Sequence, residues 1–129
     1  MEILKWNDSL SVKNENIDSQ HKKIIELTNN LIKNSNASYN SEIVSETLRD
    51  LLLHYRTHFQ DEEKLLKEKN YPKLDEHIKI HEKFIYDVAM FCKNVIEMDN
   101  TLTIKLTKFL VDWVVEHVSV DDQDYKKYL

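Results

Sequence analysis

The sequence predicts an all-α protein, folded as an up-down-up-down antiparallel four-helix bundle with an N-terminal arm and a short C-terminal helix. The chain has no glycine and one proline, whereas sheet proteins use glycine in tight hairpins. Apolar residues recur at helical spacing in four long segments. The connections between these segments are short, which favours antiparallel neighbours.

The 129-residue length fits one domain. We expect an arm over about residues 1–17, helices over about 18–33, 41–69, 72–97 and 101–118, and a tail over 119–129. Asp18 or Ser19 is suited to cap the first helix, because short polar side chains accept hydrogen bonds from the first amides. Asn70 fits a left-handed stop to the second helix, and Pro72 suits the first turn of the third.

Each predicted helix carries an apolar stripe. The stripes are Ile24, Ile25, Thr28, Leu31 and Ile32; Val44, Leu48, Leu51, Leu52, Tyr55, Phe59, Leu65 and Leu66; Leu74, Ile78, Phe84, Ile85, Val88, Cys92 and Val95; and Leu102, Leu106, Phe109, Leu110 and Trp113. We expect these faces to form the core.

Charge and composition argue against several classes of function. A net charge of −5, with lysine and arginine spread along the chain, argues against nucleic-acid binding. Asp87 and Asp112 interrupt the longest apolar stretches, so we expect no membrane span. The N-terminal residues are polar where a signal peptide needs an apolar run. Cys92 is the single cysteine and cannot form an internal disulfide, so we expect a cytoplasmic protein.

Histidines are the unusual feature of the predicted core. Five of the six fall on the apolar stripes or continue them: His21, His58, His77, His81 and His117. Buried imidazoles without a common partner would each need separate hydrogen bonds. A metal site satisfies them together, and antiparallel packing would bring all five to one end of the bundle. Ligand chemistry alone also allows zinc or manganese.

The spacing of the acidic residues refines this metal site. His77 and His81 are four residues apart, as are His58 and Glu62, so each pair shares a helix face. His117 and Asp122 are five apart, which suits a helix that ends near Val118 and turns back. Two carboxylates among five imidazoles would bridge two neighbouring cations.

The segments "IDSQHKKI", "HFQDEEKLL", "HIKIHEKF" and "WVVEHVSVDDQDY" resemble the hemerythrin family, and within it the single-domain bacterial members, over essentially the whole chain. The resemblance implies a bundle that holds two non-haem iron ions. His77, His81 and His117 would complete one iron, and His21 and His58 the other. Glu62 and Asp122 would bridge the two, together with a solvent-derived oxygen. O2 would bind at the open position of the second iron, in an apolar pocket lined by Trp113 and Val114, which are also ordinary core residues.

Four polar neighbours compete with these assignments. His54 lies about 40° in helical phase from His58 and about 6 Å along the axis. We expect it to pack or hydrogen-bond near the site rather than bind metal. Asp61 and Glu63 are expected in solvent. Asp121 rivals Asp122, but the family spacing, with Tyr125 following, favours Asp122.

The expected function is reversible O2 binding for storage, delivery or buffering, without enzymatic activity. Diiron oxidases use more carboxylates and the ExxH motif, which this sequence lacks. The alternatives are a diiron enzyme that acts on peroxide, an oxidisable substrate or nitric oxide, and an O2-sensing module. We expect a monomer; the sequence identifies no protein partner.

Overall fold

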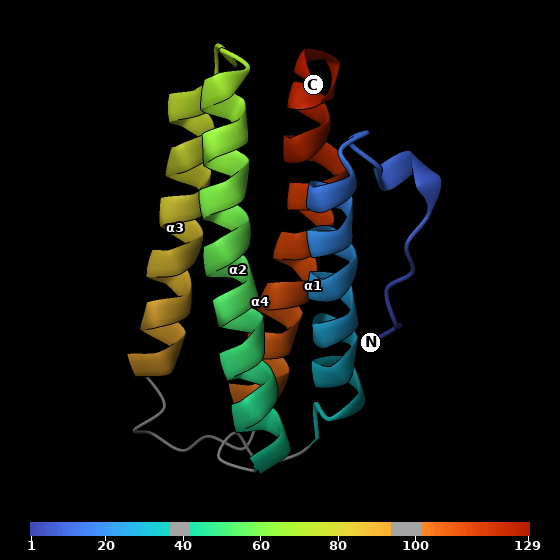
Figure 1. Ribbon diagram of the computed structural model, residues 1–129. Helices are drawn as coiled ribbons and strands as arrows, with labels where there is room; N and C mark the ends of the chain where they lie inside the picture. Colours follow the sequence, from blue (N-terminus) through green and yellow to red (C-terminus); the bar gives the residue numbers. More distant parts are fainter. Residues whose placement is uncertain (37–41, 94–101) are drawn as a thin grey trace.

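The computed structural model of the protein describes residues 1–36, 42–93 and 102–129. Four antiparallel helices form the bundle (Figure 1): α1 (Glu15–Lys33), α2 (Glu42–Glu68), α3 (Leu74–Lys93) and α4 (Leu102–Glu116). A short 3-10 turn, η1 (Asp8–Leu10), lies in the arm. After α4 the chain continues through a π-helical turn, η3 (His117–Asp121), and a 3-10 helix, η4 (Asp122–Tyr128). The predicted fold class is confirmed.

The first helix begins earlier than predicted. Its cap is Asn14, whose side chain accepts a hydrogen bond from the Ile17 amide, so α1 starts at Glu15. Asp18 holds the arm instead: its carboxylate accepts hydrogen bonds from the Val12 amide and the Ser11 hydroxyl. The expected cap at Asp18 or Ser19 was therefore wrong, because Asp18 faces the preceding chain.

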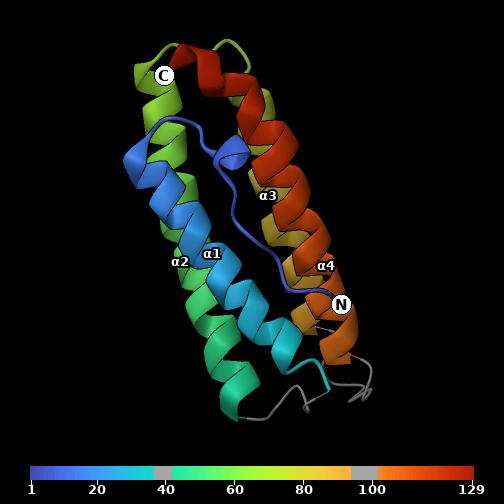
Figure 2. The ribbon, with the colours of Figure 1, turned by 90° about the vertical axis from the view of Figure 1, so that its right-hand side faces the viewer.

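The N-terminal arm runs lengthwise beside α1 and α4 before it reaches the start of α1 (Figure 2). The Asn29 side chain pairs with both backbone groups of Leu4, at 2.8 and 2.9 Å. Lys22 Nζ lies 5.1 Å from the centre of the Trp6 ring. The arm is therefore attached to α1 by polar contacts as well as by packing.

The turn between α2 and α3 depends on Asn70. Its φ of 55° is the left-handed conformation predicted for it, and the Tyr71 amide donates to the Leu66 carbonyl. The third helix begins at Leu74, so Pro72 lies in the turn and not, as predicted, in the first turn of the helix.

The apolar stripes meet in the core largely as predicted. Ile24, Leu31, Leu51 and Leu110 are fully buried. Ile85 was expected on the buried face of α3 but is 57% exposed. The side chains of Cys92, Val95 and Leu102, and the predicted end of the third helix near Glu97, lie outside the described residues. Among the helices described, none is long and apolar enough to cross a membrane.

The antiparallel order sets where the site forms. α1 packs against α2 and α4, and α2 packs against α3. The starts of α1 and α3 therefore lie level with the ends of α2 and α4, at the end of the bundle that carries the C-terminus (Figure 1). This is the level at which the five core histidines were expected to meet.

Candidate metal centre

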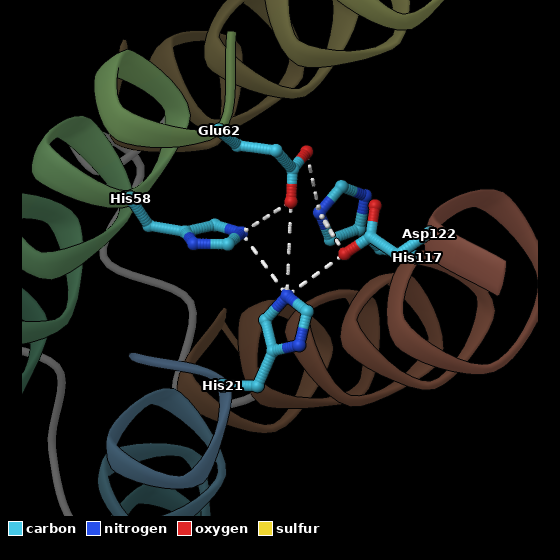
Figure 3. Close-up of side chains that lie close together, drawn as sticks. All are labelled: His21, His58, Glu62, His117 and Asp122. Atoms are coloured by element: carbon cyan, nitrogen blue, oxygen red, sulfur yellow. Dashed lines mark hydrogen bonds and ion pairs between the residues drawn. The ribbon is translucent and has the colours of Figure 1, made fainter. Parts of the chain in front are cut away.

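All seven predicted metal ligands converge at this end of the bundle. None is more than 3% exposed: His21, His58, Glu62, His77, His81, His117 and Asp122. Figure 3 shows five of them pointing toward one another from α1, from α2 and from the chain that follows α4. Residues more than 100 positions apart in the sequence thus share one buried polar cluster.

Glu62 lies between two pairs of imidazoles. Its Oε2 is 3.1 Å from His58 Nε2 and 3.8 Å from His21 Nε2. Its Oε1 is 3.0 Å from His81 Nε2 and also contacts His77 Nε2. The two oxygens of one carboxylate therefore face different histidines, as a carboxylate bridging two cations must.

Asp122 makes a similar arrangement from the opposite side. Its Oδ2 is 2.8 Å from His21 Nε2 and 3.1 Å from His117 Nε2. Its Oδ1 is 3.2 Å from His77 Nε2. Both carboxylates thus contact histidines on both sides of the cluster.

A change of helix type brings Asp122 to His117. The α-helix α4 ends at Glu116, two residues before the expected end near Val118, and the chain continues as a π-helical turn. The Asp122 amide donates to the His117 carbonyl, five residues back. A π-helical turn places residues five apart on one face, so this spacing fits a shared site where a regular α-helix would not.

The ligand atoms fall into two overlapping groups. One holds His21, His58, Glu62, His117 and Asp122, and the other holds Glu62, His77, His81 and His117; within each group the atoms lie within 4.8 Å of one another. Glu62 and His117 belong to both groups. The cluster therefore offers room for two neighbouring cations.

The donor set fits metal ions. Several buried atoms lie close together in the cluster yet form no hydrogen bond of normal geometry among the described residues, namely His81 Nε2, His117 Nε2 and both carboxylate oxygens of Asp122. Unpaired buried polar atoms are costly, and bound cations would satisfy them together. Imidazole nitrogens with carboxylate oxygens suit iron, as they do zinc and manganese.

The electrostatics keep the carboxylates ionised. Burial raises the pKa of Glu62, but His58 and His117 outweigh it and hold that pKa well below its usual range. Burial lowers the pKa of His21 and His77, yet the contacts with Asp122 and Glu62 prevail and raise these pKa values to about 9 and about 10. Without metal, these two imidazoles carry protons that a cation must displace.

Outer hydrogen bonds hold two of the imidazoles. His58 Nδ1 lies 2.8 Å from Gln20 Oε1, and Gln20 Nε2 donates to Asp61 at 2.7 Å. His81 Nδ1 lies 3.0 Å from a Glu63 oxygen. Such partners fix the ring and leave Nε2 free to bind metal. Asp61 and Glu63 were predicted to be in solvent; that was wrong, because both are half-buried, and Glu63 contacts His81 while Asp61 accepts a hydrogen bond from Gln20.

Tyr125 adds a hydrogen bond to the shared carboxylate. Its hydroxyl donates to Glu62 Oε2 at 2.9 Å, and the side chain is fully buried. Burial raises the pKa of this phenol, so the hydroxyl keeps its proton. Sequence reasoning noted Tyr125 only as a spacing marker; its position three residues after Asp122 was the available signal.

Aromatic rings wall the cluster on the core side. Phe59 stacks on His81 with ring centres 3.9 Å apart, and Trp113 stacks on His117 at 4.4 Å. Phe84 lies 4.1 Å from Trp113. Val114 is 2% exposed and lines a cavity of about 160 Å³ beneath the arm. The walls therefore present little polarity toward the cluster.

The two residues considered as rival metal ligands, His54 and Asp121, lie outside both groups of ligand atoms. His54 is exposed and belongs to neither group, so the expectation that it packs near the site was wrong. Asp121 is on the outer side, with an oxygen 4.0 Å from His117 Nδ1. Burial and its acidic neighbours raise the pKa of Asp121 to about 6.

A buried, histidine-rich metal site inside a four-helix bundle defines a class of non-haem metal proteins. The chain belongs to the hemerythrin family: the profile of the hemerythrin HHE cation binding domain matches residues 12–129. Family membership and the cluster together indicate a protein that binds non-haem iron through histidine and carboxylate ligands.

Similar proteins cover nearly the whole chain. A bacteriohemerythrin of Stenotrophomonas maltophilia is 32% identical, with 97% of this chain and 80% of that protein covered. A myohemerythrin of Theromyzon tessulatum is 33% identical, with 97% and 92% covered. A bacteriohemerythrin of Campylobacter jejuni is 29% identical, with 92% and 90% covered. The crystal structure of a hemerythrin mutant superposes with a TM-score of 0.84 at 26% identity, covering 100% of this chain and 98% of that one.

Proposed function

We propose that the protein binds O2 reversibly at two non-haem iron ions, for oxygen storage, delivery or buffering, and is not an enzyme. His77, His81 and His117 would hold one iron, and His21 and His58 the other, with Glu62 and Asp122 shared together with a solvent-derived oxygen. The observation that carries this proposal is Glu62, whose two oxygens face two separate pairs of histidines.

The balance of ligands favours reversible binding. Five imidazoles and two carboxylates supply less negative charge than carboxylate-rich sites do, and so stabilise highly oxidised iron less. When bound, two ferrous ions would supply the electrons and the open coordination position that O2 binding needs. The function therefore rests on the ligand set as well as on the family.

The surrounding residues support retention of the bound gas. Phe59 and Trp113 stack on two of the histidines and keep water from the core side. Trp113 and Val114 would line the apolar pocket for O2. Tyr125 keeps its proton and holds Glu62 in place by a hydrogen bond. The chain thereby limits access of water and protons to the site.

The test is optical. The protein is loaded with ferrous iron without air, O2 is admitted, and the visible spectrum is recorded before and after O2 is removed. We expect a visible band that appears with O2 and fades as the colourless form returns, with two irons per chain by metal analysis. A stable ferric spectrum that does not reverse would favour the diiron-enzyme alternative.

The proposal also covers where the protein is located and whether it assembles. A lone cysteine suits a reducing compartment, and we place the protein in the cytoplasm as a monomer. Size measured by sedimentation in the iron-loaded state tests the monomer.

A further inference from the structure

We propose that an apolar pocket between α2 and α3 binds small monocarboxylates with an apolar body, such as medium-chain fatty acids. This binding site is separate from the metal cluster and goes beyond O2 binding. Three features of the molecule support this site: the size of the pocket, its apolar lining and the guanidinium of Arg56 at its edge, which is unpaired among the described residues.

The pocket has the size and lining of a ligand site. Its volume is about 400 Å³, within the range typical of small-molecule sites. The walls are aliphatic and aromatic side chains of the two helices: Leu52, Tyr55 and Phe59 on α2, and Phe84, Val88 and Ala89 on α3. These side chains can enclose an alkyl chain but offer few hydrogen bonds.

One charged side chain sets the chemistry of the ligand. Arg56 lines the pocket, is exposed, and makes no ion pair or hydrogen bond within the described part of the chain. A guanidinium binds a carboxylate through two parallel hydrogen bonds. An apolar acid would thus place its chain between the helices and its carboxylate at Arg56.

The exposed Ile85 supports an occupant. This side chain lines the same pocket and is 57% exposed, although its helical position predicted burial. A ligand chain in the pocket would cover it. By contrast, the cavity of about 360 Å³ between α3 and α4 has three carboxylates in its lining, Asp87, Glu116 and Asp121, beside apolar side chains, and these carboxylates would repel an acid.

The pocket shares a wall with the metal cluster, which provides a spectroscopic signal. Phe59 lines the pocket and stacks on His81, while Phe84 lines it and lies 4.1 Å from Trp113. A bound ligand should therefore change the emission of Trp113. Trp6 is the other tryptophan, so a Trp6→Phe background isolates this signal.

The experiment is calorimetric titration of the full-length, metal-loaded protein with octanoate. We expect saturable binding, about tenfold weaker in Arg56→Gln because a charge-assisted hydrogen bond is lost. Ala89→Leu, which fills the pocket, should abolish binding. Arg49→Gln is the matched control, since Arg49 is exposed on the same helix and does not line the pocket. 1-Octanol, without the charge, should bind more weakly than octanoate.

Two outcomes would overturn the site. Octanoate binding that is equal in wild type and Arg56→Gln would remove the role of the cation. A dimer that Ala89→Leu disrupts, in a protein that shows no octanoate binding, would assign the pocket to a second copy of the chain. Neither outcome depends on O2 binding, so the two proposals fail separately.

Discussion

The two sides of the histidine cluster share their carboxylates but differ in their outer support. One side of the cluster holds His77 and His81 of α3, and we call it the α3 side. There, His81 Nδ1 contacts the carboxylate of Glu63. The other side holds His21 of α1 and His58 of α2, and we call it the α1 side. There, His58 Nδ1 contacts the neutral side-chain amide of Gln20, which in turn donates a hydrogen bond to Asp61. A charged acceptor raises the basicity of an imidazole more than a neutral amide does. The two sides of the cluster are therefore unequal, although they are built from the same residue types.

The imidazole count adds to this difference. If His117 joins His77 and His81, one side has three imidazoles and the other has two. In the proposed diiron site, the side with fewer histidines would keep the open position that O2 needs. One end of a bundle can thus present two groups of metal ligands that differ in only a few side chains.

The largest effect is expected from the shared carboxylate. Glu62→Gln keeps the shape of the side chain but removes its charge and replaces one of its two oxygens with an NH2 group that cannot bind metal. We expect metal analysis to show iron content reduced by more than half. Glu68→Gln, on the same helix but exposed, is the control. Full iron content in Glu62→Gln would mean that Glu62 is not shared.

Removing a histidine from one side should separate the two positions. Under the proposed assignment of His117 to the side of His77 and His81, His58→Ala leaves His21 as the only imidazole on its side, whereas the α3 side keeps three. We expect one iron to be lost and the other retained, and stable O2 binding to disappear. Asp122→Asn should instead weaken both positions. Loss of both irons in His58→Ala would show that the sides are not independent.

The pH dependence of metal binding tests both sides at once. The pKa of His21 is about 9 and that of His77 about 10, so both are protonated at pH 7 in the metal-free protein. Only the neutral imidazole binds metal, so binding must release about one proton from each side. Affinity should rise with pH by about tenfold per pH unit for each proton, until these pKa values are passed. Calorimetry in two buffers of different ionisation enthalpy measures the release; no proton released would contradict it.

A smaller change should alter only the α3 side. Glu63→Gln replaces the charged partner of His81 with a neutral one, and we expect metal affinity there to fall by about tenfold. Competition with a chelator of known affinity measures this. The control is Glu82→Gln, an exposed acid on α3. Equal weakening at both positions would argue that Glu63 acts through the fold rather than through His81.

The smallest effect is expected at His54. The side chain is exposed and belongs to neither ligand group, so His54→Gln should keep two irons. The free energy of unfolding should change by less than about 0.5 kcal/mol, as for ordinary surface substitutions. Loss of iron in this variant would mean that the ligand set is incomplete.

Periodicity in the sequence predicted the bundle well. The spacing of Leu51, Leu110 and similar residues reports which face of a helix is buried, and those faces do meet in the core. It failed at Ile85, because one apolar residue at the edge of a stripe can lie on either side of the boundary. It also placed the start of α1 too late, since Asp18 and Asn14 are equally good caps by residue type.

The seven clustered residues were predictable from the sequence because their residue types and intervals are rare together. His77 and His81, or His58 and Glu62, share a face of any regular helix. The partners of these histidines were not predictable in the same way. Gln20, Asp61 and Glu63 look like ordinary surface residues, and only the packing of α1, α2 and α3 brings Gln20 and Glu63 to imidazole nitrogens and Asp61 to Gln20.

The sequence by itself determined the helical class, the buried faces and the residue types of the cluster, because each depends on spacing along one helix. Tertiary structure alone decided the π-helical turn that carries Asp122 to His117. It also decided the outer partners of the histidines and the pocket beside Arg56. The outer partners and the pocket depend on distances between side chains of different helices, and such distances are set only when the helices pack at a particular register.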